Sequence, residues 1–190
     1  MFPISHFNIT RTPFYYYDKT LLSNTLAKLI RLAGERNYHI HYAVKANANP
    51  EILKLIAASG IGADCVSGGE IKAALEAGFP AKKIVFAGVG KADWEIEYAL
   101  EKKIFCFNVE SAEELSVIEE LAKKKENIAS IALRINPNID AHTHEYITTG
   151  LSENKFGIPI EMLDSIFSQI QRSPHVQLVG FHFHIGSQIL

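Results

Sequence analysis

Short apolar runs alternate with amphipathic stretches along most of the chain. In order, the apolar runs are Phe14–Tyr17, Tyr38–Val44, Gly62–Val66, Ile84–Phe86, Ile104–Val109, Ile128–Ile135 and Val176–Phe183. Runs of this length are typical of strands in a sheet that is buried on both faces. The stretches between them place apolar residues on one helical face. The alternation therefore predicts strands joined by helices, which is the connection found in a parallel sheet.

Several amphipathic stretches also carry signals for where a helix begins or ends. The residues suited to cap a helix are Asp18, Asn49, Ser67 and Ser111. Glu70 and Glu114 follow the two serines at the spacing of a capping box. Gly34 is expected to end the first long helix. A later helix is expected to begin at Pro159, because apolar residues recur after it at helical spacing.

Two architectures satisfy this alternation, an open doubly wound sheet and a (β/α)8 barrel. No G-x-G-x-x-G motif follows the first barrel-type strand, so the dinucleotide-binding fingerprint is absent. Polar residues stand where the predicted strands end, as catalytic groups do in (β/α)8 barrels. These residues are Lys45, Asp64, Asn108, Arg134 and His184. We therefore predict an α/β fold of the (β/α)8 TIM-barrel type.

The predicted barrel is expected to be incomplete. Apart from Phe14–Tyr17, six strand-like runs are present, whereas a closed barrel has eight strands and about 250 residues. The 190 residues are therefore expected to be the front part of a longer protein, with a partial barrel over residues 18–190. An open piece of this kind leaves sheet edges unpaired, so we expect it to be inactive alone.

Composition and charge narrow the possible function classes. A net charge of -2, with 21% charged residues, provides no electrostatic reason to expect nucleic acid or an anionic membrane as a partner. No apolar run approaches the roughly 18 residues that span a bilayer, and the first residues lack signal-peptide features. Cys65 and Cys106 lie in strand-like runs, which favours reduced core residues over a disulfide. The expectation is a cytoplasmic enzyme.

Lys45 stands directly after the apolar run that ends at Val44. In one interpretation it reaches solvent or pairs with a carboxylate such as Asp64. In the other it is a Schiff-base lysine, because burial among apolar neighbours lowers the pKa of an ammonium group and supplies a free amine. Its position alone leaves both interpretations open.

Other polar side chains near strand ends have competing interpretations. His182 and His184 are two residues apart and so share one face of a strand. This spacing is a weak metal signal, and we predict no metal site, whereas a planar imidazole can stack on an aromatic cofactor. Arg134 is either a surface arginine or a fork-shaped donor for a phenolate, carboxylate or phosphate oxygen. Glu70 already has an explanation in the fold, because it stands at the capping-box position after Ser67.

Five motifs occur in one order: "YAVKAN", "DCVSGGE", "LRINPN", "TGLSENKFGI" and "FHFHIGSQI". Together they resemble the group IV (fold-type III) pyridoxal-phosphate decarboxylases, whose barrel is of the alanine racemase type. "YAVKAN" is shared with ornithine and arginine decarboxylases, whereas "KFGI" together with "HIGSQI" is similar to the diaminopimelate branch. The resemblance covers nearly the whole chain from Phe14 onward.

The resemblance implies pyridoxal 5'-phosphate (PLP) as cofactor and assigns roles to single residues. Lys45 would form the Schiff base with the cofactor, and the ring of His184 would stack on the pyridine ring. Arg134 would lie near the phenolic oxygen of the cofactor, and Ser187 near its phosphate. The remaining expected residues are Asp64, below the cofactor, and Glu70, as a possible support.

The implied reaction is decarboxylation of meso-2,6-diaminopimelate to L-lysine and carbon dioxide, in lysine biosynthesis, by a homodimer when the protein is complete. Residues 1–17, through Phe14–Tyr17, would then pair with a β-rich domain outside the barrel. Two alternatives stay open. One is the same chemistry on ornithine, arginine or carboxynorspermidine, and the other is a non-catalytic PLP-binding protein of cofactor homeostasis.

Overall fold

The computed structural model describes residues 3–136 and 156–185 of the protein. The chain divides into two compact units, residues 1–38 and residues 39–190. The sequence predicted a domain boundary after residue 17, and both this boundary and the extent of the barrel domain stay predictions. Among the predicted site residues, Ser187 lies outside the described residues.

The first unit contains two helices, α1 (Ile4–Phe7) and α2 (Lys19–Gly34). Helix α2 begins where the sequence predicted, because the Asp18 carboxylate accepts a hydrogen bond from the Leu21 backbone N–H at 2.9 Å. It also ends at the predicted glycine. Residues 14–17 form neither helix nor strand here, so their pairing with a further β-rich domain stays a prediction.

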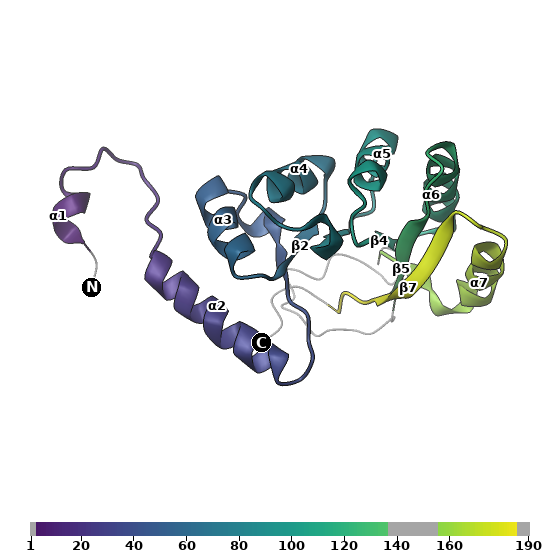
Figure 1. The fold of residues 1–190 in the computed structure, drawn as a ribbon, viewed down its shortest axis with the longest axis horizontal. Helices are drawn as coiled ribbons and strands as arrows, with labels where there is room; N and C mark the ends of the chain where they lie inside the picture. The colour runs from purple at the N-terminus through teal and green to yellow at the C-terminus, as the bar shows by residue number, and fades with distance from the viewer. Residues whose placement is uncertain (1–2, 137–155, 186–190) are drawn as a thin grey trace, which may run out of the picture. The chain divides into compact units, whose positions relative to one another are not determined.

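The second unit is a parallel sheet with helices along one face (Figure 1). Its strands are β1 (His41–Ala43), β2 (Gly62–Cys65), β3 (Ile84–Phe86), β4 (Cys106–Val109), β5 (Ala129–Asn136), β6 (Ile158–Pro159) and β7 (Val176–His182). Strands β1 to β5 are hydrogen-bonded in chain order, and β5 pairs with β7 on its other side. The short β6 pairs with the end of β5. This is the arrangement of a (β/α)8 barrel, and the six predicted barrel strands are confirmed.

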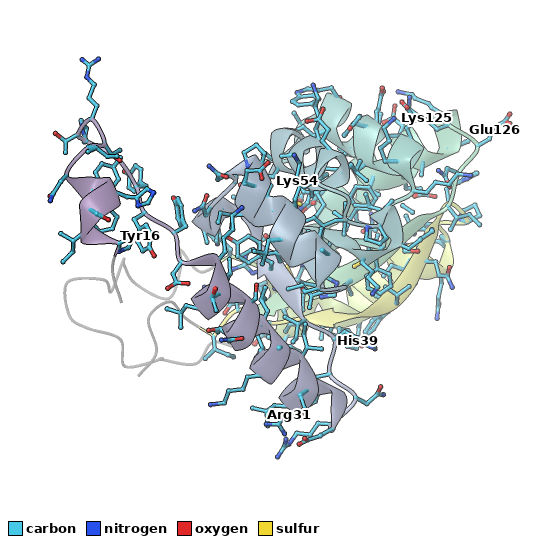
Figure 2. The ribbon with its side chains drawn as sticks, turned by 60° about the vertical axis from the view of Figure 1, so that its left-hand side comes forward. Tyr16, Arg31, His39, Lys54, Lys125 and Glu126 are labelled. Carbon is cyan, nitrogen blue, oxygen red and sulfur yellow. The ribbon has the colours of Figure 1, made fainter. Side chains whose placement is uncertain are left out.

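Helices connect successive strands and cover the outer face of the sheet (Figure 1). They are α3 (Pro50–Ala58), α4 (Gly68–Glu76), α5 (Asp93–Lys102), α6 (Ala112–Lys124) and α7 (Leu163–Gln171). The predicted caps Asn49, Ser67 and Ser111 are confirmed, since each accepts a backbone N–H bond at its helix start. Helix α7 begins later than predicted, because a 3₁₀ turn follows Pro159. Exposed charged side chains such as Lys54 lie on the outer helix surfaces (Figure 2).

The core lies between the sheet and the helices. Residues that pair directly across neighbouring strands point to the same face. One such row consists of Cys65, Phe86, Phe107 and Ile131, which are all buried. The row next to it alternates to the opposite face and contains Asp64, paired with Val85. The inner face of the sheet therefore carries the polar residues, and the helix-facing side is apolar.

Gly62, the first residue of β2, leaves no room for a side chain. A Cβ atom there would lie 2.5 Å from the carbonyl oxygen of Lys83 and would also overlap the ring of His41. We expect Gly62→Ala to lower the free energy of unfolding of the full-length protein by about 1–3 kcal/mol, because the backbone must shift. Denaturant unfolding measures this change.

Gly69→Ala is the matched control. Gly69 lies in α4, where the nearest neighbour of an added Cβ would be 3.7 Å away, and alanine is favoured over glycine in helices. This control should leave stability unchanged or raise it. Equal stability of the wild type and Gly62→Ala would contradict the overlap that the structure describes.

Candidate active site

A cavity of about 410 Å³ runs along the inner face of the sheet. Its lining is largely apolar and comes from strands β1 to β5 and from β7. The polar residues that line it are His41, Asp64, Asn108 and His182. A partly apolar cavity with a few converging polar groups is the usual form of a small-molecule site.

Lys45, Asp64 and His184 converge at the carboxyl ends of the strands. Ala43 of β1 pairs with Asp64 of β2, and Lys45 follows two residues after Ala43. Asp64 is within electrostatic reach of both Lys45 and His184. The structure therefore brings three of the predicted site residues to one edge of the sheet.

Lys45 is exposed, in contrast to the burial on which the Schiff-base interpretation depended. Strand β1 ends at Ala43, and residues Val44–Ala46 form a 3₁₀ turn. The lysine thus stands beyond the last strand pairing, where its side chain can reach solvent. In the described residues its amine is therefore accessible, and its reactivity cannot be derived from an apolar enclosure.

The carboxyl group of Asp64 is partly unpaired in the described residues. Its Oδ1 atom is buried and accepts no hydrogen bond within residues 3–136 and 156–185. Burial raises the pKa of this carboxyl group, the charge of Lys45 opposes the shift, and the charge of Glu70 adds to it. An unpaired buried oxygen is unfavourable, so the site suits a ligand or a protonated neighbour that supplies a donor.

His182 is the second side chain with a buried, unpaired atom. Its Nδ1 has no hydrogen-bond partner in the described part of the chain. Burial lowers the pKa of the imidazole, and the positive charge of Arg134 lowers it further. His182 is the last residue of β7 and pairs with Arg134 of β5, two residues before His184.

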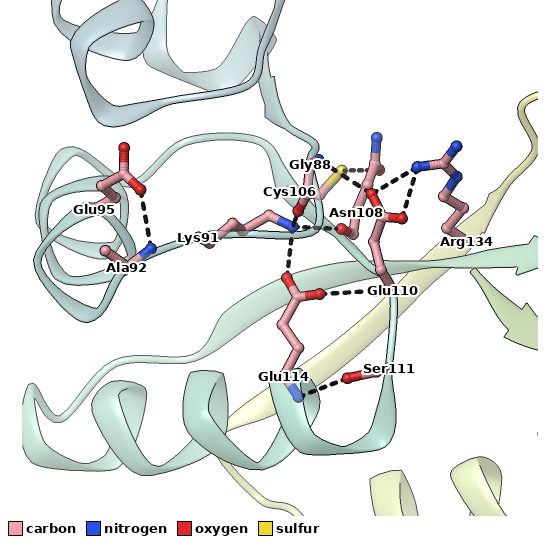
Figure 3. A network of polar contacts seen from close by, with 10 residues as sticks. All are labelled: Gly88, Lys91, Ala92, Glu95, Cys106, Asn108, Glu110, Ser111, Glu114 and Arg134. Carbon is pink, nitrogen blue, oxygen red and sulfur yellow. Dashed lines mark hydrogen bonds and ion pairs between the residues drawn. The ribbon is translucent and has the colours of Figure 1, made fainter. Parts of the chain in front are cut away.

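Arg134 is held by a residue that the sequence reasoning missed, Glu110. The Nη1 atom of Arg134 donates to Oε1 of Glu110 at 2.8 Å and to Oε2 at 2.6 Å (Figure 3). The exposed fractions of the two side chains are 13% and 4%, so this is a largely buried ion pair. Glu110 directly follows β4, and this strand-end position is the signal that could have identified it.

Lys91 and Glu114 form a second buried ion pair beside the first. The side chain of Lys91 is 1% exposed, and its ammonium group donates to Glu114 Oε1 at 2.5 Å and to the carbonyl oxygens of Gly88 and Asn108 (Figure 3). Burial raises the pKa of the Glu114 carboxyl group, and the charge of Lys91 opposes this shift. All three ammonium hydrogens are therefore used within the protein.

The two predicted capping boxes are only half right. Ser67 and Ser111 cap their helices as predicted, but the carboxylates do not return to the N–H groups of these serines. Glu70 accepts instead from Val66 N–H at 2.8 Å, and Glu114 accepts from the N–H that precedes Ser111, also at 2.8 Å. Each carboxylate thus holds the end of the preceding strand segment. This role in the fold accounts for Glu70 without any contact to a ligand.

The cysteines have the environment of core residues. Burial raises the pKa of Cys65 to about 12 and that of Cys106 to about 11, so both thiols are protonated at neutral pH and unsuited as nucleophiles. Among the described residues, no cluster of three or more His, Cys, Asp and Glu side chains is arranged for a metal ion. Within the same residues, no helix has both the length and the apolar character of a membrane span.

Similarity to known proteins covers most of the chain. Residues 23–190 match the family described as "Pyridoxal-dependent decarboxylase, pyridoxal binding domain". The chain is 59% identical to diaminopimelate decarboxylase of Bacteroides thetaiotaomicron over 191 residues, which is 100% of this chain and 50% of that protein. It is 45% identical to diaminopimelate decarboxylase of Campylobacter jejuni over 179 residues, which is 94% of this chain and 44% of that protein. The chain spans about half the length of the curated relatives it matches.

Solved structures show the same likeness. Diaminopimelate decarboxylase from Helicobacter pylori, complexed with L-lysine, superposes with a TM-score of 0.86 and 46% identity, over 98% of this chain and 48% of that one. The enzyme from M. jannaschii, in co-complex with L-lysine, gives a TM-score of 0.87 and 39% identity, over 97% of this chain and 44% of that one.

Proposed function

The chain belongs to the family of pyridoxal-dependent decarboxylases, and we propose that the protein converts meso-2,6-diaminopimelate to L-lysine and carbon dioxide, a reaction of lysine biosynthesis. The observation that carries this proposal is the 59% identity to the Bacteroides thetaiotaomicron enzyme along the whole chain. Two solved relatives that hold L-lysine, the product of the proposed reaction, support the same substrate.

The residues at the carboxyl ends of the strands fit PLP, the cofactor of this family. A primary amine suits the aldehyde of PLP, a planar imidazole suits its ring, and a guanidinium group suits its phenolic oxygen. The buried atoms without partners, Oδ1 of Asp64 and Nδ1 of His182, support the fit because they leave polar groups for a ligand. In this proposal Lys45, His184 and Arg134 hold the cofactor.

When bound, PLP supplies the electron sink that accepts the electron pair left by departing carbon dioxide. Lys45 would bind through Nζ, which must first lose its proton. Asp64 would stand beside that amine, because Lys45 is within its electrostatic reach, and burial raises the pKa of the Asp64 carboxyl group. His184 would cover one face of the ring and keep water away from it. Ser187 stays a predicted phosphate-side residue, and Glu70 a possible support.

The full-length protein, supplied with PLP, is expected to release carbon dioxide from meso-2,6-diaminopimelate and to form L-lysine in equal amount. Trapped carbon dioxide and chromatography of the amino acids measure the two products. Release from ornithine, arginine or carboxynorspermidine in place of diaminopimelate would contradict the proposed substrate. A cofactor absorption band without carbon dioxide from any of the four would favour a non-catalytic PLP-binding protein.

We further propose that the complete protein is a cytoplasmic homodimer. The dimer follows from the resemblance of the sequence motifs to the decarboxylases, and the free thiols Cys65 and Cys106 support a reducing compartment. Light scattering on the same preparation gives the molar mass, and the mass of a single chain would contradict the dimer.

A further inference from the structure

We infer that Glu110 is a positioning residue, which aims the guanidinium group of Arg134 at the cofactor site and is itself held in place by Lys91 and Glu114. The inference rests on the proposed function in one respect, because the ligand that Arg134 meets is taken to be PLP. Its structural basis is independent of the identity of the substrate.

The guanidinium group of Arg134 is held by Glu110 through one nitrogen. Only Nη1 of its guanidinium group is engaged by Glu110, and both bonds lie within hydrogen-bond distance. Within residues 3–136 and 156–185, Nε and Nη2 donate to no acceptor. The ring of Phe156 lies against the guanidinium group, with Cζ of Arg134 5.7 Å from the ring centroid. One edge of the fork is thus anchored, and the other donors are left for a ligand.

Glu110 is itself held in place by hydrogen bonds to its neighbours. Its Oε1 accepts from Gly88 N–H at 3.2 Å, and its own N–H donates to Glu114 Oε2 at 2.8 Å. Lys91 links Glu114 back to the carbonyl oxygen of Gly88, which closes a ring of hydrogen bonds (Figure 3). We call these four residues, Gly88, Lys91, Glu110 and Glu114, the carboxylate ring.

Glu110 also provides the negative charge that Arg134 needs. A guanidinium group that is largely removed from water is unfavourable without a counter-charge, and Glu110 supplies one at hydrogen-bond distance. The charges of Lys91 and Glu114 balance each other, so the carboxylate of Glu110 is left to Arg134. A donor that is ordered before the ligand arrives loses less entropy on binding. Removing the negative charge of Glu110 should therefore weaken the binding of PLP through Arg134.

The test is a double-mutant cycle on the full-length apoprotein, with the dissociation constant of PLP measured by absorbance titration. Glu110→Gln keeps an oxygen for Gly88 N–H but removes the charge. We expect it to weaken PLP binding by about tenfold, by analogy with metal sites, where losing the partner that orients a ligand side chain typically costs about 10–100-fold in affinity. In an Arg134→Met background the same substitution should have no further effect, because Glu110 acts through Arg134.

Two further variants make the result decisive. Glu120→Gln on α6 removes a carboxylate from an exposed pair with Lys124 and should bind PLP like the wild type. Glu110→Asp keeps the charge and should bind more tightly than Glu110→Gln, and it serves in the cycle if Glu110→Gln proves unfolded in thermal denaturation of the apoprotein. A purely structural role would lower the unfolding midpoint without this dependence on Arg134.

If Glu110→Gln binds PLP with wild-type affinity, or weakens PLP binding equally with and without Arg134, the inference is wrong. The proposed function is unaffected by either result. A wild-type protein that binds PLP but releases no carbon dioxide would contradict the proposed function and leave the inference standing. A wild-type protein that does not bind PLP would overturn both.

Discussion

Replacing Lys45 with alanine is expected to abolish decarboxylation by the full-length protein. Lys45 is an accessible amine at the edge of the site, within electrostatic reach of Asp64, and alanine offers no group that can bind an aldehyde. The loss in turnover should be on the order of 10³-fold or more, as is typical for a residue that reacts covalently. Carbon dioxide release under saturating PLP and diaminopimelate measures it.

Covalent labelling separates this role from a general effect on the fold. Borohydride reduction of the wild-type protein with PLP should leave a pyridoxyl adduct on the peptide that contains Lys45, as detected by mass spectrometry. The control is Lys54→Ala, since Lys54 lies on the outer surface of α3 (Figure 2), where its Nζ is 3.1 Å from Oε1 of Glu51. This variant should keep wild-type turnover. An adduct confined to another lysine would reject the assignment of Lys45.

Lys91→Met is expected to lower the free energy of unfolding of the full-length protein by about 3–5 kcal/mol. The substitution keeps most of the side-chain volume but removes the charge that faces Glu114. It also leaves the carbonyl oxygens of Gly88 and Asn108 without their donor. An uncompensated carboxylate in this setting is the main cause of the loss, and denaturant unfolding of the apoprotein measures it.

Lys124→Met is the control for Lys91→Met. Lys124 pairs with Glu120 on the outer surface of α6, where both side chains are exposed. Ion pairs of this kind contribute little to stability, so the control should unfold at the same denaturant concentration as the wild type. If Lys91→Met also unfolds there, the buried pair does not contribute to stability as proposed.

Local signals in the sequence were sufficient for much of the fold. Strand β3 coincides with the predicted run Ile84–Phe86, and Asp18 and Asn49 cap the helices that were predicted to follow them. These features depend on neighbours within a few residues, which hydrophobic period and capping chemistry describe. The predicted start of α7 was wrong because a 3₁₀ turn precedes the helix. A 3₁₀ turn and an α-helix have similar apolar spacing at their beginning.

Sequence patterns predicted less of the site than of the fold. The exposure of Lys45 depends on where β1 stops pairing with β2, which apolar pattern does not specify to the residue. Glu110 and Arg134 are 24 positions apart and meet only through the pairing of β4 with β5. The predicted roles of Lys45, His184 and Ser187 came from motifs that resemble a family, and these roles remain to be measured.

The carboxylate ring also limits how this part of the protein can evolve. Every hydrogen of the Lys91 ammonium group is committed, to two backbone oxygens and one carboxylate. A planar guanidinium group in its place cannot direct hydrogens to three points around a single nitrogen, so arginine is no substitute for this lysine. Glu114 is tied to the same nitrogen and to the Glu110 backbone. Lys91 and Glu114 are therefore expected to be exchanged together or not at all as sequences diverge.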